Sequence, residues 1–219
     1  MYKKITHNIT EEHFHHPTAT QIKKAVDKIS PNPKPKMQAF ETSSSFRNSI
    51  LNYFTDFLSN MNSIVNCIKK PDQDLQAAQE VAFATVEKIG DIVRPYYGFE
   101  FAQQLNSAMS AYILTMANYV RSLNIKTDTY VWGQKLDGVS GDVAMTLGLT
   151  NSLTWQWNTI KDLWKTISDS WVAEAKALLI NDTNAYTAAK EKSKQTLTTF
   201  IDMFITGVTL QHPDYFLPG

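Results

Sequence analysis

The sequence has one cysteine, no long apolar run and no net charge, and each of these shortages excludes a class of protein. A single thiol, Cys67, cannot form an intrachain disulfide, and a structural zinc site usually takes two or more thiolates. No apolar run approaches the roughly 18 residues of a membrane-spanning helix, and the opening MYKKITHNIT lacks the apolar centre of a signal peptide. We therefore expect no membrane span, a reducing compartment, and a location in the cytoplasm or inside a particle assembled there.

The charges balance overall but are unevenly distributed along the chain. Lysine and arginine together number 21, as do aspartate and glutamate, so the chain lacks the cationic excess typical of nucleic-acid binding. Residues 1–36 nevertheless hold seven lysines against three acidic residues, a net charge of +4 that leaves −4 on the rest. Pro31, Pro33 and Pro35 exclude a helix at the end of this segment. We predict a basic N-terminal arm over residues 1–36 that meets an anionic partner, and a folded domain over residues 37–219.

From Met37 onward, apolar residues recur every three or four positions, which is the period of an amphipathic α-helix. Alternating β-branched runs bounded by turn residues are absent, so the pattern predicts helices and no strands. Six helical segments are expected: five at about residues 46–68, 72–93, 101–123, 151–180 and 182–204, and the fourth in chain order beginning after Thr127 or Asp128, with Pro95 ending the second. Short connections make neighbouring helices antiparallel. The predicted fold is all-α, an antiparallel six-helix bundle built from three αα-hairpins.

The segment at residues 151–180 contains four of the five tryptophans and is expected to organise the core. Its apolar stripe at steps of three and four comprises Leu153, Trp157, Ile160, Trp164, Ile167, Trp171, Ala175 and Leu178. At roughly 25 cal/mol per Å² of buried apolar surface, these tryptophans contribute several kcal/mol. We predict one core helix across the whole segment. Trp155 lies off the stripe and is a candidate for a surface contact.

The fourth helical segment is rich in glycine, at positions 133, 138, 141 and 148. Each glycine in a helix interior costs up to about 1 kcal/mol relative to alanine. Either the helix breaks near Gly138 or the glycines allow close packing against the tryptophan-rich helix, and we expect close packing. The first, third and fifth helices start about 55 residues apart, which suggests an internal repeat of a duplicated hairpin. Any six-helix bundle, however, shows a similar periodicity.

Two short motifs carry a resemblance to a known family: PYYG at residues 95–98 and FIDMFITGVTLQHPDYF at residues 200–216. They resemble an uncharacterised family of small bacterial, mostly Gram-positive, all-helical proteins with a mid-chain PYYG turn and a C-terminal DM...G...HPDYF-like segment. The resemblance covers about residues 46–216 and implies inward-facing histidines that bind a metal or a polar ligand. The matching positions here hold Leu51, Tyr112 and Ile167, which are poor metal ligands, whereas Glu174 matches an acidic position of the family. The resemblance therefore implies no histidine site in this chain.

Histidines near the N-terminus form the densest set of potential metal ligands. His13, His15 and His16 have suitable nitrogen donors, but a stable site also needs a rigid frame and further ligands. A di-iron carboxylate site in a bundle needs Glu-x-x-His on core helices, and the one instance, Glu12 to His15, lies in the predicted arm. The favoured interpretation is a solvated arm, and we expect no cofactor.

An aromatic cluster is expected where two predicted hairpins end. Tyr96, Tyr97 and Phe99 follow the second helix, and Trp155 lies at the start of the fifth. Exposed aromatic side chains are enriched at protein interfaces, where they supply much of the binding energy. We predict that this cluster binds a protein partner or another subunit.

The sequence favours a non-enzymatic interaction or structural protein that assembles through its aromatic hairpin ends. Cys67 has no histidine partner nearby in the sequence and is expected to pack in the core. The alternative is a metal- or small-ligand-binding helical bundle, including an enzyme, which needs polar side chains that converge inside the core. Tyr112, Asp56 and Glu174 are the candidates for such interior polar groups.

Overall fold

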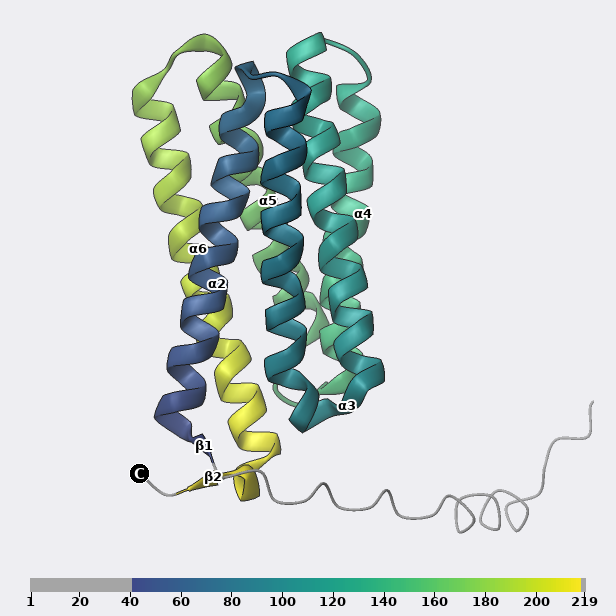
Figure 1. Cartoon of the computed structure of the whole chain (residues 1–219), viewed down its shortest axis with the longest axis vertical. Helices are drawn as coiled ribbons and strands as arrows, with labels where there is room; N and C mark the ends of the chain where they lie inside the picture. Colours follow the sequence, from purple (N-terminus) through teal and green to yellow (C-terminus); the bar gives the residue numbers. More distant parts are fainter. Residues whose placement is uncertain (1–40, 218–219) are drawn as a thin grey trace, which may run out of the picture. The chain divides into compact units, whose positions relative to one another are not determined.

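A computed structural model describes residues 41–217, which form five α-helices (Figure 1). The elements in chain order are β1 (Glu41–Thr42), α2 (Ser43–Asn66), the 3-10 helix η1 (Cys67–Lys69), α3 (Asp72–Ile125), α4 (Thr129–Thr150), α5 (Trp157–Ile180), α6 (Thr183–Gln211), the 3-10 helix η2 (Pro213–Tyr215) and β2 (Phe216–Leu217). The predicted all-α class is confirmed. The predicted arm and its three clustered histidines lie outside the described residues.

The longest helix, α3, consists of two arms that meet at Gly98. This residue has φ 85° and ψ 173°, a conformation that residues with a Cβ atom rarely adopt. From this bend the two arms, residues 72–97 and 99–125, run side by side (Figure 1). Pro95 lies inside the first arm, so the prediction that it ends the helix is wrong. Proline in the last turn of a helix removes one backbone hydrogen bond, and the glycine three residues later provides the reversal.

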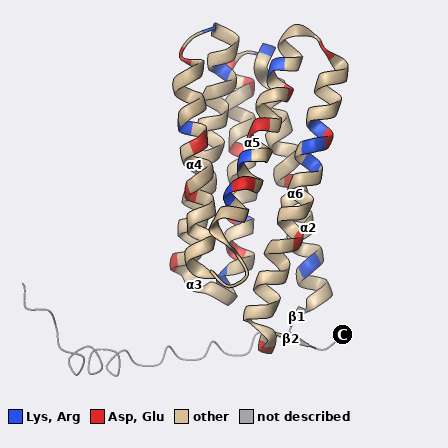
Figure 2. Cartoon of the chain, turned by 180° about the vertical axis from the view of Figure 1, so that it is seen from behind, with Lys and Arg blue, Asp and Glu red and all other residues tan. Residues whose placement is uncertain are grey.

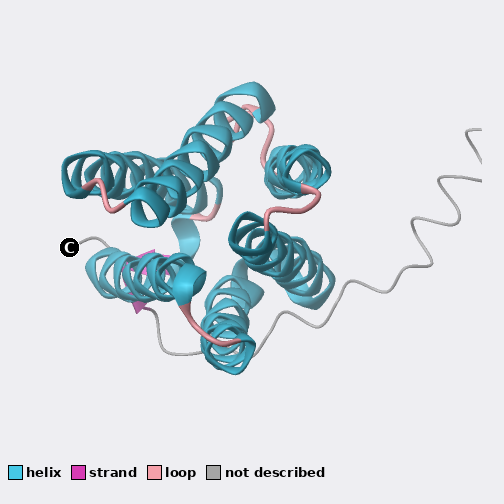
Figure 3. Cartoon of the chain, turned by 90° about the horizontal axis from the view of Figure 1, so that it is seen from above, coloured by secondary structure: helices cyan, strands magenta, loops and turns pink. Residues whose placement is uncertain are grey.

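Aromatic side chains of α2, α5 and α6 form the centre of the core. The helices surround this core when they are viewed along their axes (Figure 3). Phe57 of α2 packs edge-on against Trp164 and Trp171 of α5, with ring centroids 6.2 and 6.1 Å away. Phe200 of α6 contacts Trp164 in the same manner at 5.4 Å. Because edge-to-face pairs stabilise beyond their buried area, these contacts make α5 the central helix.

α5 begins at Trp157 rather than at Asn151, so the start of the predicted helix is a loop. The Asn151 side chain donates a hydrogen bond to the backbone oxygen of Gly207 on α6 (3.0 Å). The Asn151 backbone oxygen accepts a hydrogen bond from the nitrogen of Trp155 (2.7 Å). The loop turns Leu153 into solvent, where it is 91% exposed, and leaves Trp157 43% exposed. Both were predicted to lie on the buried stripe, and the contact with α6 is the reason that they do not.

α4 is continuous, so the glycines do not break it near Gly138. A Cβ atom at Gly148 would lie 3.1 Å from the Cβ atom of Trp157, so here the helix does approach α5 closely. A Cβ atom at Gly138 or Gly141 would meet nothing within 4 Å. Close packing against the tryptophan-rich helix therefore explains Gly148 but neither of the two middle glycines.

The first and last described helices lie next to each other. Phe54 of α2 packs against Phe200 and Phe204 of α6, and Arg47 pairs with Asp202 across the same boundary at 2.7 Å. At the end of the bundle β1 pairs with β2 in parallel over two residues each, a short pairing that the sequence pattern did not predict. None of the helices in the described part of the chain combines the length and apolarity needed to cross a bilayer.

Candidate interaction surface

Tyr112, a predicted interior polar group, is fully buried in a chain of hydroxyl groups. Its hydroxyl oxygen lies 2.8 Å from that of Ser168, which lies 2.9 Å from that of Ser140. Burial raises the pKa of Tyr112, so the phenol stays protonated. The three residues belong to α3, α5 and α4, and their hydrogen bonds satisfy one another inside the core. This arrangement joins three helices and leaves the phenol without access to a substrate.

Glu174, the second predicted interior group, is a buried carboxyl group between α5 and α6. Ser193 donates a hydrogen bond to its Oε1 atom at 2.8 Å, while Oε2 forms no hydrogen bond. Burial raises the pKa of Glu174 to about 7, against the opposing effects of the Ser193 hydrogen bond and the charge of Lys190. The carboxyl group therefore changes its charge near neutral pH. Asp56, the third predicted group, is exposed, so the prediction that it lies in the interior is wrong.

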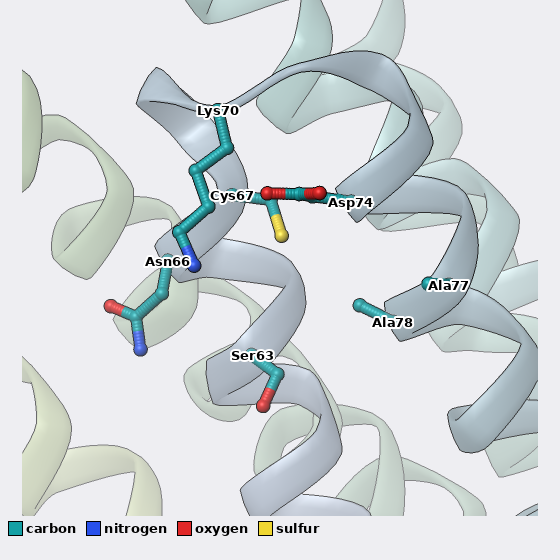
Figure 4. Close-up of a pocket in the computed structure, with 7 residues that line it drawn as sticks. All are labelled: Ser63, Asn66, Cys67, Lys70, Asp74, Ala77 and Ala78. Atoms are coloured by element: carbon teal, nitrogen blue, oxygen red, sulfur yellow. The ribbon is translucent and has the colours of Figure 1, made fainter.

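Cys67 lines a depression of about 350 Å³ at the turn between α2 and α3 (Figure 4). Figure 4 shows its sulfur atom pointing into the space between the two helices, with Lys70 extending towards Asn66. Burial raises the pKa of the Cys67 thiol, which keeps it protonated and weakly nucleophilic. Within residues 41–217, no three histidine, cysteine, aspartate or glutamate side chains gather closely enough to hold a metal ion.

Trp155 is buried rather than available for a surface contact, which corrects its predicted role. Its ring stacks on Phe204 at 5.0 Å with an interplanar angle of 7°. Its Nε1 atom donates a hydrogen bond to the backbone oxygen of Met203 at 3.3 Å. The ring fits because Gly207 of α6 has no side chain to occupy the same space. Trp155 therefore fastens the loop after α4 to α6.

The predicted clustering of Tyr96, Tyr97 and Trp155 is partly observed. Tyr97 lies 5.3 Å from Trp155 and 4.8 Å from His212, measured between ring centroids. Tyr96 stacks on Phe216 at 5.4 Å. Both tyrosines are half-buried, so these rings mainly join the α3 bend to the end of α6.

His212, at the end of α6, is a member of this cluster that the sequence did not reveal. Its ring lies between Tyr96, Tyr97 and Tyr215, with centroids 5.9, 4.8 and 5.7 Å away. Burial lowers the pKa of His212, which favours the neutral imidazole. In the sequence, His212 lies between the predicted end of the sixth helix and Pro213, a position typical of an ordinary C-terminal turn. Only its tertiary contacts show that it belongs to the aromatic cluster.

Phe99 is the predicted aromatic residue that does face solvent, with 57% of its surface exposed. It directly follows the Gly98 bend and precedes Glu100, which lines a groove of about 580 Å³ between the second arm of α3 and α4. The groove is lined by Glu100, Gln103, Gln104, Ser107, Met145, Thr146, Leu149 and Thr150. Leu149 is 81% exposed and Met145 49% exposed, so large apolar side chains form its rim.

The surface around this groove is unusually poor in charge. Residues 101–120 and residues 143–160 contain no lysine, arginine, aspartate or glutamate. The last turns of α4 are accordingly tan in Figure 2. We define the α3–α4 outer face by its exposed apolar side chains, which are Phe99, Leu114, Val131, Met145 and Leu149. Met145 and Leu149 both line the groove, so two of these apolar side chains are adjacent there.

No family model, curated protein or solved structure matches this chain. The function proposed below therefore rests on the residues of this chain alone.

Proposed function

We propose that the protein is a non-enzymatic interaction or assembly protein, which binds a protein partner through the α3–α4 outer face. The observation that supports this most is the exposure of Leu149, Met145 and Phe99 beside a groove with few charges. Full burial of a leucine, methionine or phenylalanine side chain stabilises by about 1.5–3 kcal/mol. Three such side chains, flanked by amides and hydroxyls that complete hydrogen bonds, are sufficient for a specific contact.

The interior polar groups favour this function over a small-ligand site. Tyr112 and Glu174 hydrogen-bond to serines and line neither the groove nor the depression at Cys67. A ligand site in a bundle core needs several polar side chains that converge on one space. The two residues belong to separate pairs, so each fits a role in helix packing.

We further propose that the chain is built from six helices in three αα-hairpins with an internal repeat. It belongs in this proposal to the cytoplasm and to the family with the PYYG turn. Its basic arm over residues 1–36 binds an anionic partner. The Gly98 bend supports the hairpin description, because it separates two arms that would otherwise form one helix.

Photocrosslinking in the cells that make the protein tests the proposed surface. Replacement of Leu149 with p-benzoylphenylalanine places a reactive ketone on the outer face without disturbing the core. We expect a covalent adduct with a protein after irradiation. The matched control is the same replacement at Val81, which is exposed on the first arm of α3 and lies outside the face. Absence of an adduct from position 149, or equal yields from both positions, would overturn the proposal.

A further inference from the structure

The outward side of α4 carries a symmetric pattern of side chains. Val131, Lys135, Gly138, Asp142 and Met145 follow one another at steps of three and four, so they share one side of the helix, and all five are exposed. Gly138 lies at the centre of the pattern, with Lys135 and Asp142 on either side of it. The apolar Val131 and Met145 form the two ends. Read in the reverse direction, the pattern is the same except that the two charges exchange places.

Packing within the chain does not require glycine in the middle of this pattern. A Cβ atom at Gly138 would meet no atom within 4 Å. Glycine there costs about 1 kcal/mol of helix stability relative to alanine. What a glycine does allow is a short distance to a second helix, since interaxial distances depend on the side chains at the crossing point.

The two charges of the pattern have no ionic partner among the described residues. The ion pairs of the bundle involve neither Lys135 nor Asp142. By contrast, the neighbouring Asp137 lies 3.4 Å from Lys165 of α5. Seven residues separate the two charges, about 10 Å along a helix, so they cannot pair with each other.

A second copy of α4 supplies both partners at once. When two copies cross in antiparallel directions at Gly138, Lys135 of each copy lies opposite Asp142 of the other. A parallel arrangement would instead place lysine opposite lysine and aspartate opposite aspartate, which is unfavourable. Two-fold contacts in which the same patch occurs on both partners are the commonest kind in homo-oligomers.

We infer that the partner is a second copy of this chain, joined by a two-fold antiparallel contact between the two α4 helices that crosses at Gly138. This inference rests on the proposed function, because it names the partner of the α3–α4 outer face. Val131 of one copy then approaches Met145 and Leu149 of the other. The apolar rims at both ends of α4 are covered, and the paired charges fix the direction and register of the contact.

Charge exchange in the full-length chain tests the register. Sedimentation equilibrium of the original chain should give twice the chain mass of 24.8 kDa at high concentration. Lys135→Asp alone, or Asp142→Lys alone, places like charges together at two points of one contact and should weaken the dimer by at least about tenfold. The double variant restores both pairs with their signs exchanged and should recover the dimer.

Two further variants separate assembly from folding. Gly138→Leu adds a side chain where the single chain has free space, so the fold should persist while the crossing is blocked and the dimer is lost. Lys176→Asp reverses an exposed charge on α5, away from the contact, and should leave the dimer unchanged. Circular dichroism should show the same helix content in the original chain and in all five variants.

A monomer at every concentration, a dimer insensitive to both single reversals, or a double variant that stays monomeric would each overturn the inference. The photocrosslink at position 149 separates this outcome from failure of the proposed function. An adduct with a different protein, together with a monomeric chain, overturns the second copy as partner but leaves the interaction function intact. Absence of any adduct together with a monomeric chain overturns both.

Discussion

α4 and α5 are antiparallel neighbours of similar length, 22 and 24 residues, but they differ in the side chains that they turn outward between their ends. α5 buries its large residues, such as Trp164 and Trp171, and turns charges such as Lys165 and Asp169 outward. α4 buries leucines as well, at positions 136 and 147, but it also exposes Val131, Met145 and Leu149. A helix whose packing is completed within one chain places its large apolar side chains inside, and the exposed ones of α4 therefore fit the proposed contact.

The largest expected effect tests the buried side of α5. Trp164→Ala removes a ring that contacts Phe57, Tyr112 and Phe200, and we expect a loss of about 3–5 kcal/mol in the free energy of unfolding. Trp157→Ala is the matched control on the same helix, because its ring is 43% exposed, and we expect a loss of about 1 kcal/mol. Urea unfolding of both variants provides the measurement. Equal losses would show that α5 does not organise the core.

The next effect concerns the pH dependence of α5 packing on α6. The pKa of Glu174 is about 7 in the fold against the usual 4.5, so the folded chain holds a proton that the unfolded chain releases over this interval. The free energy of unfolding should therefore fall as pH rises from about 4.5 to 7, by up to about 3 kcal/mol, and the loss persists above pH 7.

Glu174→Gln keeps the shape of the side chain and removes the titration. We expect this variant to be more stable than the original chain at pH 8 and nearly equal to it at pH 4.5. Glu191→Gln, at an exposed carboxyl group on α6, serves as the control and should retain the original pH profile. Identical pH profiles for the Glu174 variant and the original chain would contradict the argument from burial.

The smallest effect compares two glycines within α4. Gly148→Ala inserts a methyl group 3.1 Å from the Cβ atom of Trp157 and should cost about 1 kcal/mol, because α5 must shift to accept it. Gly141→Ala fills open space in the same helix and should stabilise by about 0.5–1 kcal/mol. Thermal melts of dilute samples measure both changes. Melting temperatures that shift in the same direction for both variants would contradict the difference in packing between Gly148 and Gly141.

The sequence pattern predicted the core helices well because burial follows the spacing of apolar residues. Ile160, Trp164 and Ile167 are buried at the predicted positions, and α4 begins at Thr129, just after Asp128. These features depend on residues close together in the sequence. The local period of the apolar residues was therefore enough to identify them.

The sequence pattern failed to predict features in which a residue distant in sequence determines the local structure. Nothing in residues 151–156 breaks a helical period, and the loop there depends on Asn151 and Trp155 meeting Gly207, more than 50 residues later. Likewise, the pKa of Glu174 depends on burial against α6 and on Ser193, which the spacing on α5 alone does not specify. The pattern of Val131, Lys135, Gly138, Asp142 and Met145 was present in the sequence, but its exposure became evident only with the fold.

The pairing of β1 with β2 joins the two ends of the described chain, and this long separation in sequence affects the order of folding. Most neighbouring helices in the bundle are consecutive in sequence, so they can pack as soon as a short connection folds back. The boundary between α2 and α6 instead unites residues as far apart as Arg47 and Asp202. Both this boundary and the β1–β2 pairing close long loops, so their formation has a high entropic cost until the intervening helices have packed. We therefore expect docking of α6 against α2 to be a late step of folding.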